Sequence, residues 1–163
     1  MSYLLDTNVF IQAKNLHYGL DFCPAFWDWI DEAHDKGDVF SIEKVSDELA
    51  AGGDDLAAWA QEHTDSFFLK PDAAVVPSFQ VTSTWASGAG YDPAAVSTFL
   101  QVADYYLVAH AHAHGHVVVT HEVPAASSKR IKIPNACIGL EVKCMTPFQM
   151  LRTERARFVL GPI

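Results

Sequence analysis

Four acidic residues of this sequence lie next to apolar residues, where an isolated charge is costly to bury. They are Asp6, Glu48, Asp104 and Glu122. If these carboxylates met in the folded chain, their mutual repulsion would raise their pKa values unless cations neutralised them. Because every ligand would be an oxygen atom, Mg²⁺ or Mn²⁺ fits the set better than zinc, copper or an iron–sulfur centre. The residue types therefore point to a site for a divalent metal ion.

Short apolar runs place two of these acids at the ends of strands. Residues 3–5 predict a buried strand that delivers Asp6 at its carboxyl end. The β-branched run 117–120 predicts a second strand, which ends just before Glu122. Further strands are predicted over residues 39–42, 66–69 and 142–145.

Segments with helical apolar spacing alternate with the strands. A long helix is expected from Asp92-Pro93 to His114 and would carry Asp104, while Glu48 falls in a helix over residues 44–51. The other helices are expected to begin at Val9, at Pro24 with a stop at Lys36-Gly37, at Asp54 or Asp55 with an end near His63, and at Phe148 with an end at Phe158.

Two stretches lack a clear pattern of either kind. Residues 73–90 give a weak signal that ends in a loop at 88–90, and residues 123–136 are expected to be a polar, basic loop. Strands that alternate with helices predict an α/β protein, a three-layer α/β/α sandwich around a central parallel sheet. The length of 163 residues fits a single domain over 1–163. Ligands of such sheets bind at the carboxyl ends of the strands, where Asp6 and Glu122 are expected.

Four blocks of this sequence, in this order and across nearly the whole chain, resemble those of the PIN-domain nucleases. They are Leu5-Asp6-Thr7-Asn8, Val45-Ser46-Asp47-Glu48-Leu49, the run from Ala103-Asp104 to Ala111, and Val118-Val119-Thr120-His121-Glu122. Three more segments resemble a branch related to VapC-type toxins: Phe26-Trp27-Asp28-Trp29, Asp55-Leu56 with Trp59, and the run from Lys132 to Cys137. The last acid departs from the family pattern, in which Asp is usual at the position of Glu122.

This resemblance implies a metal-dependent endoribonuclease, a hydrolase that cleaves RNA phosphodiester bonds with a metal-activated water. Asp6, Glu48 and Asp104 would hold Mg²⁺ or Mn²⁺. Glu122 would complete the site or hold a second ion, from a side chain one methylene longer than that of Asp. The resemblance also implies that the RNase is the toxin of a toxin–antitoxin pair, with an antitoxin protein as its partner.

The resemblance assigns supporting roles to further residues. Thr7, Asn8 and Thr120 would orient Asp6 or the attacking water through hydrogen bonds. A homodimer is implied as well, and the terminal segment and the aromatic region 27–29 are candidate contributors to its interface.

Charge is distributed unevenly along the chain. Residues 1–128 carry 4 basic and 18 acidic side chains, whereas residues 129–163 carry 7 basic and 2 acidic ones. An acidic protein that cuts a polyanion needs a local positive surface. We therefore expect the basic segment, defined as Lys129, Arg130 and Lys132, to bind the phosphate backbone of RNA. The alternative is a solvated loop that these charges keep soluble.

Two other functions compete with an active nuclease. An aspartyl-phosphate hydrolase also places its nucleophile after the first strand, but that chemistry normally needs a second acid two residues later, where this chain has Asn8. A catalytically inactive PIN scaffold that binds RNA or a protein partner is the other alternative. The presence of all four acids argues against the loss of catalysis.

Three further features bear on the site and on the cellular location. The histidines at positions 110, 112, 114 and 116 are expected to form a helix end with some core-facing rings, and the orientation of His121 stays undecided. The three cysteines form no C-x-x-C pair, which argues against a cysteine zinc site. No apolar run approaches the roughly 20 residues that span a bilayer, and the N-terminus lacks the basic start of a signal peptide. A cytoplasmic protein without membrane contact is expected.

Overall fold

The computed structural model describes residues 1–161 and contains a five-stranded parallel sheet with the order β3-β2-β1-β4-β5. Its strands are β1 Tyr3–Leu5, β2 Val39–Ile42, β3 Phe68–Leu69, β4 Val117–Val119 and β5 Cys144–Met145. All five strands lie where apolar runs predict them. The two edge strands are shorter than expected, at two residues each.

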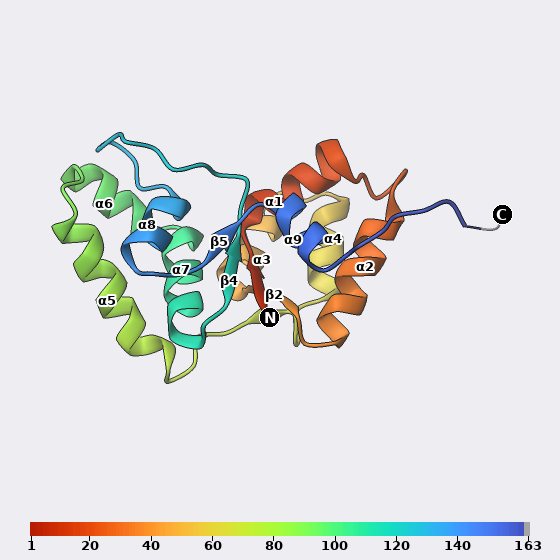
Figure 1. The fold of residues 1–163 in the computed structure, drawn as a ribbon, viewed down its shortest axis with the longest axis horizontal. Helices are drawn as coiled ribbons and strands as arrows, with labels where there is room; N and C mark the ends of the chain where they lie inside the picture. Colours follow the sequence, from red (N-terminus) through yellow and green to blue (C-terminus); the bar gives the residue numbers. More distant parts are fainter. Residues whose placement is uncertain (162–163) are drawn as a thin grey trace.

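Helices cover both faces of this sheet. They are α1 Thr7–Gln12, the π-helix η1 Ala13–His17, α2 Pro24–Asp35, α3 Glu43–Ala50, α4 Asp55–Glu62, α5 Val75–Gly88, α6 Pro93–Phe99, α7 Ala103–His114, α8 Ile133–Gly139 and α9 Pro147–Thr153. Figure 1 shows α5, α6, α7 and α8 on one side of the sheet and α2, α4 and α9 on the other. The predicted three-layer α/β/α sandwich is confirmed.

The central strand β1 is buried along its whole length. Tyr3, Leu4 and Leu5 have no exposed surface, because neighbouring strands flank β1 and helices cover both of its faces. In the sequence, the buried strands of such parallel sheets are continuous apolar runs, rather than runs in which apolar and polar residues alternate. The buried Ser41 hydroxyl of β2 donates a hydrogen bond of 2.6 Å to the Leu5 carbonyl oxygen, so its polar group is satisfied at the carboxyl end of β1.

Helix α5 occupies most of the stretch that gave a weak signal. Its buried residues Ser78, Thr82 and Ala86 recur at four-residue spacing and are small, while Val76 and Val81 are exposed. This stripe of small residues allows α5 to lie close to α7. The contact between α5 and α7 is the most extensive one that α5 makes with any element. A search for large apolar residues at helical spacing misses such a helix.

The prediction of one long helix from 92 to 114 is wrong. Helix α6 ends at Phe99, and Val102 is extended, with φ −111° and ψ 167°. A new helix, α7, starts at Ala103 and places Asp104 in its first turn. The interruption separates α6 from α7 without any glycine or proline between Phe99 and Ala103 to reveal it.

The basic loop and the terminal helix are both shorter than predicted. The loop after β4 ends at Lys132, because Ile133–Gly139 forms α8 with a proline in its first turn. Helix α9 ends at Thr153, and the non-helical chain beyond it places Phe158 against the rings of Tyr18 and Phe26. Within residues 1–161, no helix is long and apolar enough to cross a membrane.

Trp27 belongs to the core and is not available for a dimer interface. Its indole N–H donates to the Tyr18 carbonyl oxygen at 2.7 Å, and its ring packs edge-on against Trp59 with centroids 5.0 Å apart. Only 4% of its surface is exposed. The part of the homodimer prediction that rested on Trp27 is therefore wrong, whereas Trp29 is half-buried.

The contact between α5 and α8 can be tested through Gly139, where a Cβ atom would lie 2.0 Å from Nε1 of Trp85. We expect Gly139→Ala to destabilise the fold by roughly 1–3 kcal/mol in urea unfolding, since the indole must move to make room. Gly88→Ala is the matched control, because a Cβ atom at Gly88 would meet nothing within 4 Å and alanine favours helices. Equal stability of the two variants would contradict this packing of α5 on α8.

Candidate functional site

The strand order reverses direction at β1, since β2 and β3 follow on one side and β4 and β5 on the other. In open α/β sheets, ligands bind at the carboxyl ends of the strands beside such a reversal. Asp6 comes directly after β1, and Thr120, His121 and Glu122 come directly after β4. Two of the four predicted acids thus lie at the expected edge.

Asp6 is the most deeply buried acid of the site, with 2% of its surface exposed. Its backbone N–H donates to the Val119 carbonyl oxygen at 2.9 Å, and its Oδ2 accepts a 2.9 Å hydrogen bond from the Thr120 hydroxyl. Burial, followed by repulsion from Asp104 and Glu122, raises the pKa of Asp6 to about 7, against the opposing effect of the Thr120 hydrogen bond.

Glu48 reaches the same edge from α3 and ties three helices together. Its Oε2 accepts a 2.6 Å hydrogen bond from the Thr7 hydroxyl in the first turn of α1. Its Oε1 accepts from the Ala103 backbone N–H at 3.3 Å, at the start of α7. The Glu48 carboxylate is therefore held by Thr7, which follows Asp6 in the chain, and by Ala103, which precedes Asp104.

Asp104 lies in the first turn of α7, beside the position that Glu48 reaches. Burial raises its pKa to about 6, and repulsion from Glu122 and Glu48 adds to the effect, while Arg130 opposes it. Repulsion thus acts between Asp104 and both Glu48 and Glu122, and between Asp6 and Asp104. The four acids form one coupled group, called the acid cluster below.

Glu122 faces the basic segment. Its Oε2 lies 3.4 Å from Nζ of Lys132 and 3.8 Å from Nη2 of Arg130, and its side chain is 8% exposed. Within residues 1–161 this buried Oε2 accepts no hydrogen bond of acceptable geometry. A buried carboxylate oxygen without a hydrogen bond is unusual, and it marks a position where a ligand or ion would be favourable.

The three predicted supporting residues have different surroundings. Thr120 contacts Asp6 as expected, and its hydroxyl oxygen also accepts the Glu122 backbone N–H at 3.1 Å. The Thr7 hydroxyl binds Glu48, while a hydrogen bond from the Thr7 backbone to Asp6 acts to lower the pKa of Asp6. Asn8 is exposed, and its side chain makes no hydrogen bond within the described part of the chain. The structure therefore brings two of the three to the acids.

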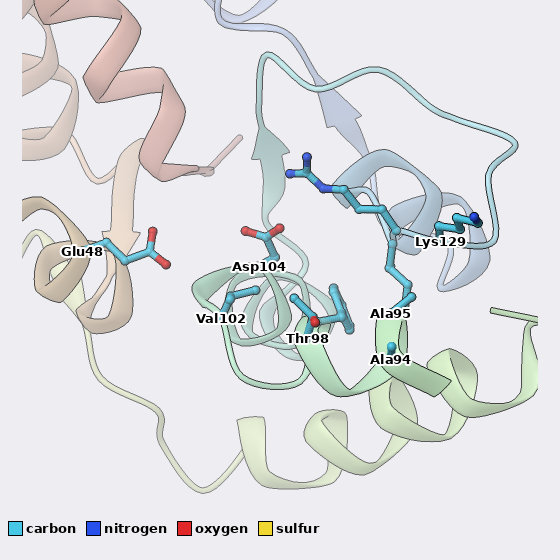
Figure 2. A pocket seen from close by; sticks show the side chains of 10 residues that line it. Glu48, Ala94, Ala95, Thr98, Val102, Asp104 and Lys129 are labelled. Carbon is cyan, nitrogen blue, oxygen red and sulfur yellow. The ribbon is translucent and has the colours of Figure 1, made fainter. Parts of the chain in front are cut away.

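A cleft of about 460 Å³ opens beside the acid cluster. Figure 2 shows Glu48 pointing from α3 toward Asp104, with Lys129 across the cleft from both. Arg130 also lines the cleft, so two members of the basic segment and two acids share it. The remaining walls are Ala94, Ala95, Thr98, Phe99, Val102 and Ile131.

Sequence reasoning missed the wall that α6 contributes to this cleft. Thr98 and Phe99 reach the cleft because α6 ends at Phe99 and α7 starts in a new direction. The prediction of one continuous helix did not include this interruption. The N–H of Ala103 was missed for the same reason, since it is free to bind Glu48 only at the start of a new helix.

The acid cluster matches a hard divalent cation in its chemistry but is not closed around one. Every donor is an oxygen atom, burial and then neighbouring carboxylates raise the pKa of Asp6 and of Asp104, and the buried Oε2 of Glu122 lacks a hydrogen bond. Across residues 1–161, no three His, Cys, Asp or Glu side chains converge closely enough to hold a metal ion. Metal binding would therefore require these carboxylates to move together.

Two solved structures share this fold. A chain in the crystal structure of VapBC2 from Rickettsia felis, bound to a DNA fragment from their promoter, is 18% identical with a TM-score of 0.54, over 90% of this chain and 98% of that one. A chain of FitAB bound to an IR36 DNA fragment is 19% identical with a TM-score of 0.53, over 90% and 95%. The PIN-like fold that the sequence blocks predict is confirmed.

The sequence has no match among curated proteins. A family profile, described as Domain of unknown function (DUF4411), matches residues 3–158. Because that match takes in β1, β4 and every member of the acid cluster, the chain belongs to the DUF4411 family.

Proposed function

We propose that this protein is an Mg²⁺- or Mn²⁺-dependent endoribonuclease. The observation that carries the proposal is the acid cluster itself: four carboxylates at the strand-order reversal, coupled to one another and faced by the basic segment. Such an arrangement is unstable when it is bare and charged, and a divalent cation relieves it. Cleavage of a phosphodiester substrate needs both features: a centre that binds a cation and a positive surface that binds the backbone of the substrate.

Asp6, Glu48 and Asp104 would hold the ion, and Glu122 would complete the site or hold a second one. When bound, such an ion polarises the scissile phosphate and lowers the pKa of a water molecule. The chain's own groups prepare the ligands, because Thr120 fixes Asp6 and the Thr7 hydroxyl fixes Glu48.

The basic segment would bind the RNA backbone next to these ligands. Lys129 and Arg130 line the cleft that Asp104 also lines, so a phosphate held there would lie beside the acids. Lys132 stays close to Glu122 and offsets its charge. Phosphate contacts of this type position a nucleic acid without reading its sequence.

We also propose that the RNase is the toxin of a toxin–antitoxin pair, as the VapC-type sequence blocks imply. The likeness of the fold to chains of VapBC2 and FitAB, both solved as complexes bound to DNA, supports a protein partner.

The homodimer remains a prediction of the resemblance. Light scattering at tens of micromolar would contradict it by showing a monomer.

The structure gives less support to an aspartyl-phosphate hydrolase. Asp6 would have to be the nucleophile, but it is 2% exposed and hydrogen-bonded to Thr120. Asn8, in the position of the second acid, is exposed to solvent. An attacking carboxylate needs an open path to phosphorus, which the cleft offers to Glu48 and Asp104 instead.

Cleavage of single-stranded RNA in Mg²⁺ or Mn²⁺ tests the proposal. We expect Glu48→Gln to lower the rate by roughly a hundredfold or more, since loss of even an outer partner of a metal ligand costs about 10- to 100-fold. Asp6→Asn should have a comparable effect. Asp47→Asn is the matched control, because Asp47 is the acid next to Glu48 in α3 but lies outside the acid cluster, so its substitution should leave the rate unchanged.

The outcome also separates the nuclease from an inactive scaffold. Wild-type protein that binds RNA but does not cleave it in either metal would favour the scaffold. Cleavage that survives Glu48→Gln and Asp6→Asn would show that a contaminant or another site is responsible.

The role of the basic segment predicts a change in salt dependence. In a cleavage-deficient Asp6→Asn background, replacing Lys129, Arg130 and Lys132 by alanine should weaken RNA binding. It should also flatten the plot of log affinity against log salt concentration by about 0.7 for each phosphate that the variant no longer neutralises. Lys143→Ala is the control, since Lys143 is exposed just before β5, at the opposite edge of the sheet. An unchanged slope in the triple variant would remove the basic segment from the RNA-binding surface.

A further inference from the structure

Three rings from distant parts of the chain meet at the edge of the sheet that carries the acid cluster. His17 ends η1, His121 follows β4, and Phe148 lies in the first turn of α9. The ring centroids of His17 and His121 are 5.6 Å apart, those of His121 and Phe148 5.6 Å, and those of His17 and Phe148 5.2 Å. We call these three side chains the ring cluster.

The ring cluster lies beside the acid cluster, on its other side from the basic segment. His121 stands between Thr120, which binds Asp6, and Glu122, which faces Lys132. His121 itself packs toward η1 and α9. Figure 1 shows α9 and α8 on opposite sides of the sheet, and the basic segment leads into α8. The acids therefore lie between a positive surface and an aromatic one.

The ring cluster is partly open to solvent, and the described residues leave the nitrogen atoms of its two imidazoles unused. His17 is exposed, and His121 and Phe148 are half-buried. Within residues 1–161, neither imidazole of this cluster makes a hydrogen bond, whereas His34 and His63 each use both ring nitrogens. Folding thus leaves ring faces and hydrogen-bonding atoms free at a functional edge.

We infer that the ring cluster is a stacking subsite for one unpaired base of the RNA substrate. This inference rests on the proposed function. A strand whose phosphates contact the basic segment and whose reacting phosphate lies at the acids would continue onto His17, His121 and Phe148. Aromatic and imidazole faces bind bases of single-stranded RNA by stacking, with little dependence on sequence, and free ring nitrogens can bind base edges.

Binding of a fluorescent single-stranded RNA to the Asp6→Asn protein tests the inference. His17→Ala and Phe148→Leu should each weaken binding by roughly 5- to 100-fold, the range for loss of one stacked base. His17 is exposed and Phe148→Leu keeps an apolar side chain, so both variants should melt like their parent. Phe22→Ala is the control, since Phe22 is an exposed phenylalanine outside the ring cluster and should not change binding.

Two further readouts separate stacking from charge. The ring variants should leave the salt slope unchanged, because they remove no phosphate contact. When single abasic nucleotides are scanned along the RNA, the effect of Phe148→Leu should vanish at one position, where no base remains to stack. Unchanged affinity in folded ring variants, or an effect that persists at every abasic position, would overturn the subsite.

The same experiment distinguishes failure of the inference from failure of the proposed function. RNA binding that depends on the basic segment but not on the rings overturns the subsite alone. Absence of RNA binding by the folded parent protein overturns both.

Discussion

Burial of carboxylates at one edge of the sheet, together with the repulsion between them, is the constraint on which the rest of this structure depends. Asp6 and Asp104 have pKa values raised to about 7 and about 6, mainly by burial and then by neighbouring acids. Unfolded, each group would titrate near 3.8. The metal-free folded state therefore holds more protons than the unfolded state between about pH 4 and pH 7, and its stability falls as pH rises through that range. A ligand that favours the charged form would reverse the loss.

The fold holds the acids together despite this cost. The order of the strands places Asp6 and Glu122 at neighbouring ends, and the break between α6 and α7 supplies a helix start whose N–H binds Glu48. Thr7 and Thr120 donate hydrogen bonds to two of the carboxylates. Carboxylates whose pKa values are raised by burial and by neighbouring charges are candidates for a functional site.

The sequence predicted the strands, and the positions of Asp6 and Glu122 after two of them, because both depend on short, local signals. An apolar run followed by Asp6, or valines followed by Glu122, is visible within a few residues and needs no knowledge of distant contacts. Helix α5 was not predicted, because its buried stripe of Ser78, Thr82 and Ala86 is defined by contact with α7. The break between α6 and α7 was not predicted, because no glycine or proline marks it in the sequence.

The details of the site depend on long-range packing and could not be predicted in the same way. Thr7 was expected near Asp6, but the packing of α1 on α3 turns its hydroxyl toward Glu48. Asn8 follows Thr7 in a helix, which directs its side chain about 100° away and into solvent. The side chain of His121 could be placed only once η1 and α9 were known to lie beside it.

Carbon-detected NMR titration of the Asp6 carboxyl group, with and without Mg²⁺, tests the central claim most directly. Metal-free protein should show a pKa near 7, and saturating Mg²⁺ should lower that pKa below about 5, because the cation stabilises the charged form. A pKa near 4 in the metal-free protein, unchanged by Mg²⁺, would show that the acids are neither coupled nor part of a metal site.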